Sequence, residues 1–332
     1  MNPARPKLIR QTLGRLAPLI SLTAVAALFY LYAPDKPLSL LDLKLILLHS
    51  VIVGLVALGM TLVMVSGGID LSVGSSLALA GVVAARVLSG SSEGLMPLLA
   101  VLAAAATGLL CGLYNGALIT LLRLPPFIVT LGTLGFFRGV AKWTSGSSPV
   151  YSRPGALASW VDLSPRGPLA WTLFAPVVWV MLFLAAAVAA ALHFTIPGRR
   201  LTAIGSNEEA ARRAGIPITS TKVLAYAACG LLVGLAGVVQ FARLGGSGDP
   251  TIQVGLELKA IAAVVIGGAS FAGGYVSISG ALCGALLMAL LDNRCTAVGW
   301  PNYVQELVVG HIIIAAVAVD QWRRRRSGNP AA

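Results

Sequence analysis

Charged residues are scarce in this chain. They make up 11% of the 332 residues, whereas 57% are hydrophobic, and a soluble domain carries about 25% charged residues. So much apolar surface does not fit inside one water-soluble core. The composition therefore predicts an all-α, polytopic integral membrane protein with a single transmembrane domain over residues 1–332.

The residue types that carry out catalysis are few and dispersed. The 12 acidic residues are spread thinly, and His49, His193 and His311 stand alone in separate apolar segments. The four cysteines form no C-x-x-C pair, so no metal or redox site is indicated. Neither a G-x-S-x-G motif nor a G-x-x-x-x-G-K-[ST] phosphate loop occurs. We therefore expect no catalytic centre, metal or cofactor, and ATP-driven work would need a partner that binds the ATP.

Positive charge is concentrated in three places. Basic residues cluster near the N-terminus, between Arg199 and Lys222, and in the C-terminal run 323–326. Basic clusters that flank apolar spans mark the cytoplasmic side of a membrane. Binding of nucleic acid is not expected, because it would require a soluble basic domain. The pattern thus predicts that both termini and the 199–222 stretch are cytoplasmic.

The hydrophobic runs predict about ten membrane segments. Ten crossings return the C-terminus to the side of the N-terminus, and the stretch at about 196–222 falls on that same side. The loop at about 146–167 then lies outside. The segments are expected near residues 16–33, 45–66, 71–89, 96–122, 126–145, 168–195, 223–243, 258–272, 274–291 and 304–321.

Glycines interrupt the apolar pattern once in each half of the chain. Residues 260–291 carry no charge, yet Gly267-Gly268 and Gly273-Gly274 divide them. In the first half, "SGGIDLSVG" at 66–74 has a similar character, and Asp70 or Ser72 can cap the helix that follows. Such breaks predict short or broken helices near the centre. They mark a transport pathway or a site of close helix packing, and both interpretations stay open.

The stretch 196–222 predicts one short helix between two spans. Ser206 or Asn207 can cap its N-terminus, Glu208 and Glu209 suit the positive end of the helix dipole, and Gly215 ends it. It is either an inert connection or a docking helix for a cytoplasmic partner.

Four motifs in the chain, in order, are "MTLVMVSGGIDLSVGS", "NGALITLLRLPPFIVTLGT", "AIGSNEEAARRAGI" and "LELKAIAAVVIGGASFAGG". They resemble the permease subunits of ribose-type ABC importers, the carbohydrate-uptake family. The resemblance implies a transmembrane permease, without ATPase activity of its own, for a ribose-like sugar or polyol in the cytoplasmic membrane. The partners it implies are a cytoplasmic ATPase subunit or tandem ATPase, a periplasmic or lipid-anchored sugar-binding protein, and a second permease subunit, either a copy or a paralogue. Membrane lipid surrounds such a subunit.

The resemblance also assigns an ATPase-coupling role within 196–222. Its motif falls on Gly205, Asn207, Glu208, Glu209, Ala210 and Gly215. One position departs from the family pattern, because Lys259 stands where an acidic residue is usual.

Polar residues amid apolar neighbours are candidates for the substrate pathway, because sugars are recognised by directional hydrogen bonds. Arg138 and Lys142 share one helical face, and they either have a function or reach to the outer interface. A rival function, ion-coupled secondary transport of a small polar solute, would need intramembrane carboxylates. The pathway candidates are Asp70, Ser72, Asn115, Phe127, Thr130, Gly267 and Gly268.

Overall fold

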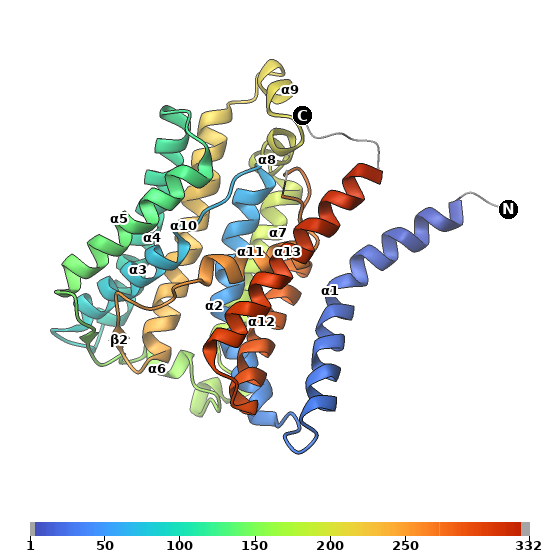
Figure 1. Cartoon of the computed structure of the whole chain (residues 1–332). Coiled ribbons are helices and arrows are strands. Elements are labelled where there is room, and N and C mark those ends of the chain that lie inside the picture. Colours follow the sequence, from blue (N-terminus) through green and yellow to red (C-terminus); the bar gives the residue numbers. More distant parts are fainter. Residues whose placement is uncertain (1–3, 272, 327–332) are drawn as a thin grey trace.

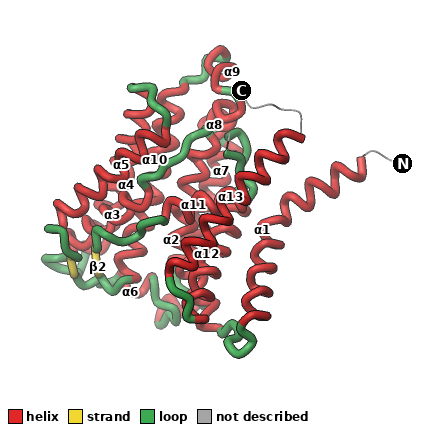
Figure 2. Tube along the Cα trace, in the orientation of Figure 1, coloured by secondary structure: helices red, strands yellow, loops and turns green. Residues whose placement is uncertain are grey.

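The computed structural model describes residues 4–271 and 273–326, and helices make up most of them (Figure 1, Figure 2). Before residue 146 the helices are α1 (Ala4–Tyr32), α2 (Leu40–Val65), α3 (Val73–Leu88), α4 (Met96–Leu121) and α5 (Pro126–Ser145). Next come β1 (Val150–Tyr151), α6 (Leu157–Trp160), the 3₁₀ turn η1 (Gly167–Thr172) and α7 (Val177–Phe194). The remaining elements are α8 (Ile196–Ser206), α9 (Glu208–Arg213), α10 (Ile218–Arg243), β2 (Ser247–Gly248), α11 (Leu256–Ile266), α12 (Ile278–Val298) and α13 (Asn302–Arg326).

Helix α2 lies at the centre of the bundle. A capping box fixes its start, since Ser39 Oγ accepts from the Asp42 N–H and Asp42 accepts from the Ser39 N–H. Every residue from Ser50 to Ser66 is buried, because α7, α10, α11 and α12 pack around it. A helix that is apolar on all sides needs such a surrounding, so α2 holds the other helices in one core.

Five of the described helices (α2, α4, α7, α10 and α12) are long and apolar enough to cross a membrane. Each of the ten predicted segments overlaps a helix. Helix α11, with 11 residues, reaches only about 17 Å of a hydrocarbon core about 30 Å thick. The prediction of short helices near the centre is therefore confirmed, whereas the number of crossings stays a prediction.

Two expected segments differ from the structure. The run 168–195 is not one helix, because η1 and a loop occupy its first part and α7 begins only at Val177. The stretch 196–222 contains two helices rather than one, since Thr195 caps α8 through its hydroxyl before Asn207 caps α9. Hydropathy locates apolar surface but does not detect a new cap inside an apolar or polar run.

The two ends of the bundle carry different elements (Figure 1). Helix α9 projects at one end, and the start of α1 and the end of α13 lie in the same half. The other end carries α6 and the short antiparallel pair of β1 with β2, in which Val150 faces Gly248. The placement of both termini on the side of 196–222 stays a prediction. The side chains of the basic clusters near the two chain ends lie outside the described part.

Helices α4 and α10 approach each other backbone to backbone at several glycines. A Cβ on Gly108 would overlap the Gly230 carbonyl oxygen, and one on Gly112 would overlap the Tyr226 carbonyl oxygen. A Cβ on Gly230 or Gly234 would likewise strike the α4 backbone. Small residues permit this close crossing in membrane bundles, so α4 and α10 form a tightly joined pair.

Candidate functional site

Helix α9 is a short, self-contained element at the end of the bundle. Asn207 Oδ1 accepts the Ala210 N–H at 2.8 Å and thereby caps the helix, which confirms the predicted cap and identifies which of the two candidates forms it. Gly215, at φ 78°, follows the helix in the left-handed conformation. Ile204, Ala211 and Ile218 form a small apolar cluster beneath α9 and fix it to α8 and α10.

Ion pairs stiffen α9. Arg212 and Arg213 pair at 3.0 Å with Glu208 and Glu209, one helical turn earlier. Lys222, at the start of α10, contacts the second Glu208 oxygen at 2.6 Å. Partial burial disfavours the Glu208 charge, but hydrogen bonds and the charges of Lys222 and Arg212 outweigh it and hold the pKa of Glu208 below its ordinary value. The pairs therefore tie α9 to α10 as a unit.

A polar cavity of about 600 Å³ adjoins α9. It lies between α9, the start of α10 and the loop that joins α4 to α5, and Arg123, Arg212, Lys222 and Glu208 line it. Three cations face one carboxylate there. The surface next to α9 is therefore suited to an acidic group of a partner.

Three distant segments meet backbone to backbone beneath α8. The Gly274 N–H donates to the Val65 carbonyl oxygen at 3.0 Å. A Cβ on Gly205 would overlap this same oxygen, and one on Gly273 would press on Gly67 and Gly205. We call Val65, Gly67, Gly205, Gly273 and Gly274 the glycine junction. It joins the end of α8 directly to both glycine-interrupted loops.

Asp70, Ser72 and Asn115 come together in a buried cluster. Asp70 Oδ1 accepts from the Ser72 N–H at 2.8 Å and from its hydroxyl at 2.6 Å. Asn115 Nδ2 donates to Ser72 Oγ at 2.8 Å and reaches both Asp70 oxygens at 3.4 Å. All three are at most 3% exposed. The Ser72 side chain does not cap α3, because its hydroxyl bonds to Asp70.

Thr130 lies beside this cluster, and Phe127 does not take part in it. The Ile69 carbonyl oxygen accepts hydrogen bonds from Thr130 Oγ1 and from Tyr226 Oη, each at 3.3 Å. Phe127, one turn earlier on α5, is 52% exposed. The loop before α3 is thus held by α4, α5 and α10 together, and its polar groups face inward.

Gly267 and Gly268 serve two different structural needs. A Cβ on Gly267 would overlap the Gly280 backbone, so this glycine lets the end of α11 touch the start of α12. Gly268 has φ 92° and open space around it, so its role is conformational. The packing interpretation therefore holds at Gly267 and leaves the pathway interpretation undecided.

Arg138 is hydrogen-bonded to a loop more than a hundred residues further along the chain. Its Nη1 donates to the carbonyl oxygens of Pro250 at 2.6 Å and Ile252 at 2.8 Å. The charge therefore anchors the loop between β2 and α11, whereas Lys142 on the same helix is exposed.

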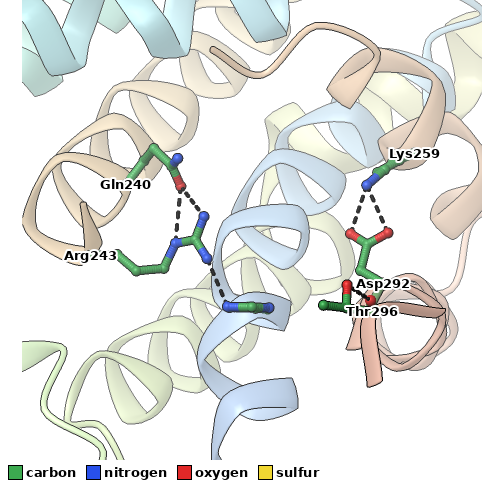
Figure 3. Close-up of polar contacts among 6 residues, drawn as sticks. Gln240, Arg243, Lys259, Asp292 and Thr296 are labelled. Atoms are coloured by element: carbon green, nitrogen blue, oxygen red, sulfur yellow. Dashed lines mark hydrogen bonds and ion pairs between the residues drawn. The ribbon is translucent and has the colours of Figure 1, made fainter. Parts of the chain in front are cut away.

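A charged cavity of about 480 Å³ lies among α2, α10, α11, α12 and α13, and its lining includes Asp42 near the start of α2 and Arg243 at the end of α10. These two helix ends lie away from α9 (Figure 1). Lys259 Nζ contacts both oxygens of Asp292, at 2.8 and 2.6 Å (Figure 3). Across the cavity, Arg243 donates to Gln240 Oε1 and lies 2.7 Å from His49 Nε2. The lysine that departs from the family pattern thus has a carboxylate partner.

Sequence reasoning missed this cavity. In the sequence, His49 is a lone histidine in an apolar segment, and Lys259 is only a departure from the family pattern. The available signal was that Lys259 and Asp292 are opposite charges at the edges of one uncharged 32-residue run, but no periodicity relates residues on two different helices.

The family model described as "Branched-chain amino acid transport system / permease component" matches residues 43–317. The chain belongs to this family. Because five described helices have the length and apolarity of membrane spans, this member is a multi-pass membrane protein. No solved structure gave a significant match.

Curated relatives match along nearly the whole chain. The ribose import permease protein RbsC of Escherichia coli K12 is 38% identical over 92% of this chain and 93% of its own. RbsC of Bacillus subtilis strain 168 is 37% identical, with 92% of each chain covered. The L-arabinose ABC transporter permease protein AraH of Azospirillum brasilense is 34% identical over 85% of this chain and 80% of its own. Two of these relatives are ribose import permeases and the third is an ABC transporter permease for L-arabinose, so the resemblance noted in the sequence is confirmed.

Proposed function

We propose that this chain is the membrane subunit of an ABC importer that carries a monosaccharide, ribose-like or a related sugar or polyol, into the cell. The observation that carries the proposal is the similarity over nine-tenths of the chain to ribose import permeases, joined by an arabinose permease. The subunit has no catalytic centre of its own. A separate ATPase binds and hydrolyses ATP, and a periplasmic or lipid-anchored binding protein delivers the sugar to a pair of permease subunits.

Helix α9 is the element on which the ATPase acts. The capped and ion-paired helix is stiff enough to transmit force, and the cation-rich cavity beside it suits an acidic partner surface. Gly205, Asn207, Glu208, Glu209, Ala210 and Gly215 form this coupling loop. The loop, both termini and α9 then lie in the cytoplasm, and residues 146–167 lie outside.

The glycine junction links α9 to the substrate pathway. Movement of α8 reaches the loop that carries Asp70 through Val65 and Gly67, and reaches the loop after α11 through Gly273. Asp70, Ser72, Asn115, Phe127, Thr130, Gly267 and Gly268 border the pathway in this proposal. The buried cluster opens toward the sugar in another conformation of the transport cycle.

The test is sugar uptake by sealed vesicles that contain the permease with its ATPase and binding protein. D-ribose and L-arabinose should accumulate only when ATP is supplied on the ATPase side. The rival function, ion-coupled secondary transport, predicts uptake without ATP that collapses when the ion gradient is dissipated. That second result would overturn the proposal.

A further inference from the structure

The charged cavity at the end opposite α9 has the size and the wall of a ligand site. Its volume of about 480 Å³ falls within the range of about 300–1,000 Å³ that small-molecule sites occupy. Charged side chains inside a membrane protein are costly and are retained mainly for function. In this cavity the charged side chains come from four different helices and line one shared space. They are therefore more than one isolated ion pair.

Among the described residues, Arg243 uses only part of its hydrogen-bonding capacity. A guanidinium has five N–H groups, and Nε, Nη1 and Nη2 each contact Gln240 or His49 through one of them, so two have no partner among the described residues. Because a guanidinium cannot accept, His49 Nε2 must accept, so its ring is neutral. Among the residues that the structure describes, no ion pair is found for Arg243, so its charge remains available.

Two carboxylates, Asp292 and Asp42, supply hydrogen-bond acceptors to the lining of the cavity. The side chains of Asp292 and Asp42 remain 27% and 24% exposed despite their partners. A carboxylate has about four lone-pair sites, and the Lys259 contacts occupy only part of those on Asp292. Donors and acceptors therefore line the same cavity.

The charge of the wall selects among ligand classes. The lining has two cations, Arg243 and Lys259, and two carboxylates, Asp42 and Asp292, beside a neutral His49. A balanced wall does not favour a ligand of either sign. A ligand whose groups each donate and accept a hydrogen bond satisfies both kinds of group, and hydroxyl groups have this property.

We propose that this cavity binds the transported monosaccharide as a neutral polyol, with Arg243 donating to its hydroxyls and Asp292 accepting from them. The inference rests on the proposed sugar-import function and adds where each subunit holds the sugar. Asp42, which lines the cavity, lies near the start of α2, and Val65 ends this helix shortly before the loop that carries Asp70. The proposed sugar site therefore lies about one helix length from the Asp70 cluster. The charged cavity is thus the first site in the permease that binds the sugar, at the end away from the ATPase.

Protection of an introduced cysteine tests the site in the purified permease–ATPase complex. Thr296 lines the charged cavity and is exposed, whereas Cys111, Cys229 and Cys295 are buried and Cys283 is partly buried. In a Cys283→Ala background, Thr296→Cys should react with a hydrophilic thiol reagent. Because occupancy reduces the free site by 1 + [L]/Kd, D-ribose or L-arabinose at twice its Kd should slow the reaction about threefold. The matched control is Ser164→Cys, an exposed serine at the same end, whose labelling sugar should not change.

Two further comparisons decide the chemistry. Arg243→Gln should abolish the protection of Thr296→Cys, whereas Arg166→Gln, an exposed arginine in the 146–167 loop, should preserve it. D-ribonate, the acid of the same skeleton, should protect less than D-ribose. Equal or better protection by D-ribonate would overturn the assignment to a neutral polyol.

The uptake assay separates failure of this inference from failure of the proposed function. If either sugar is imported but neither protects Thr296→Cys, the cavity is not the sugar site and the function stands. If neither sugar is imported in an ATP-dependent manner, the proposed function fails in its ribose or arabinose form, whatever the labelling result.

Discussion

At the scale of single residues, local hydrogen-bond chemistry decided which predictions could be made. Asn207 is read correctly as a cap because a short polar side chain directly before two glutamates has one favourable local use. Ser72 is the opposite case: its hydroxyl bonds to Asp70 and Asn115. A sequence does not reveal that Asn115, 43 residues away, donates a hydrogen bond to that hydroxyl. The polarity of these residues suggests a cluster, but its hydrogen bonds could not be predicted.

Replacing Asn115 with leucine tests this cluster. The change removes the donor to Ser72 and Asp70 and leaves a buried carboxylate with fewer partners. We expect the variant to lose about 1–3 kcal/mol of stability, the cost of an unsatisfied buried polar group. Thermal denaturation of the purified chain in detergent measures it. The control, Thr120→Val, removes a hydrogen bond to the backbone of its own helix and should change stability by less than about 0.5 kcal/mol. Equal melting temperatures for the two variants would contradict a stabilising role.

At the scale of elements, apolar runs locate the helices and fail at their ends. The ten segments are visible because hydropathy is a property of each run by itself. The glycine junction was not visible, since it depends on backbone atoms of three loops that meet only in the fold. The stretch 196–222 has two helices in place of one because Thr195 caps an additional helix, α8. This cap was not predicted, since Thr195 follows directly on a long apolar run.

Charge reversal on α9 tests docking of the ATPase. In the Glu208→Lys, Glu209→Lys double variant, the ion pairs with Arg212, Arg213 and Lys222 become repulsive. We expect membrane insertion to persist and co-purification of the ATPase to be lost. The control reverses two exposed acidic residues at the other end, Glu93→Lys with Asp162→Lys, and should retain the ATPase. Normal co-purification with the α9 variant would exclude α9 as the docking helix.

Gly205→Ala tests transmission separately from docking. The new methyl group would strike the Val65 carbonyl oxygen at the glycine junction, whereas the cap and ion pairs of α9 do not involve Gly205. Overpacking costs about 1–3 kcal/mol, which changes a conformational equilibrium about 5- to 150-fold. We therefore expect the ATPase to bind normally while sugar uptake falls by about tenfold or more. Gly132→Ala is the control, because open space surrounds that glycine on α5. Full uptake by Gly205→Ala would show that the junction transmits nothing.

At the scale of the whole molecule, the distribution of basic residues predicted which parts share a side. The structure places α9, the start of α1 and the end of α13 in one half (Figure 1). The charged cavity could not be predicted at this scale, since its residues come from helices whose neighbours are set only by packing. Residue patterns thus locate the apolar helices but not the helices that pack against them.

A reporter inserted after residue 155 tests the orientation of the whole chain. Residue 155 lies in the loop before α6, at the end opposite α9. A reporter there should be active on the outer side of the membrane, and the same reporter after residue 215, just beyond α9, should be active in the cytoplasm. Exchange of the two signals would reverse the orientation and place α9 away from the ATPase.

The close crossing of α4 and α10 limits how such a transporter can move. A seam made of side chains can adjust by changing rotamers, but Gly108, Gly112, Gly230 and Gly234 provide no rotamers to change. We therefore expect the two helices to move together through the transport cycle. Sliding and rocking are left to seams lined by larger side chains, such as that of α2 with α12. The seam of α2 with α12 borders the charged cavity, so the expected motion would change the shape of the place where a sugar would be held.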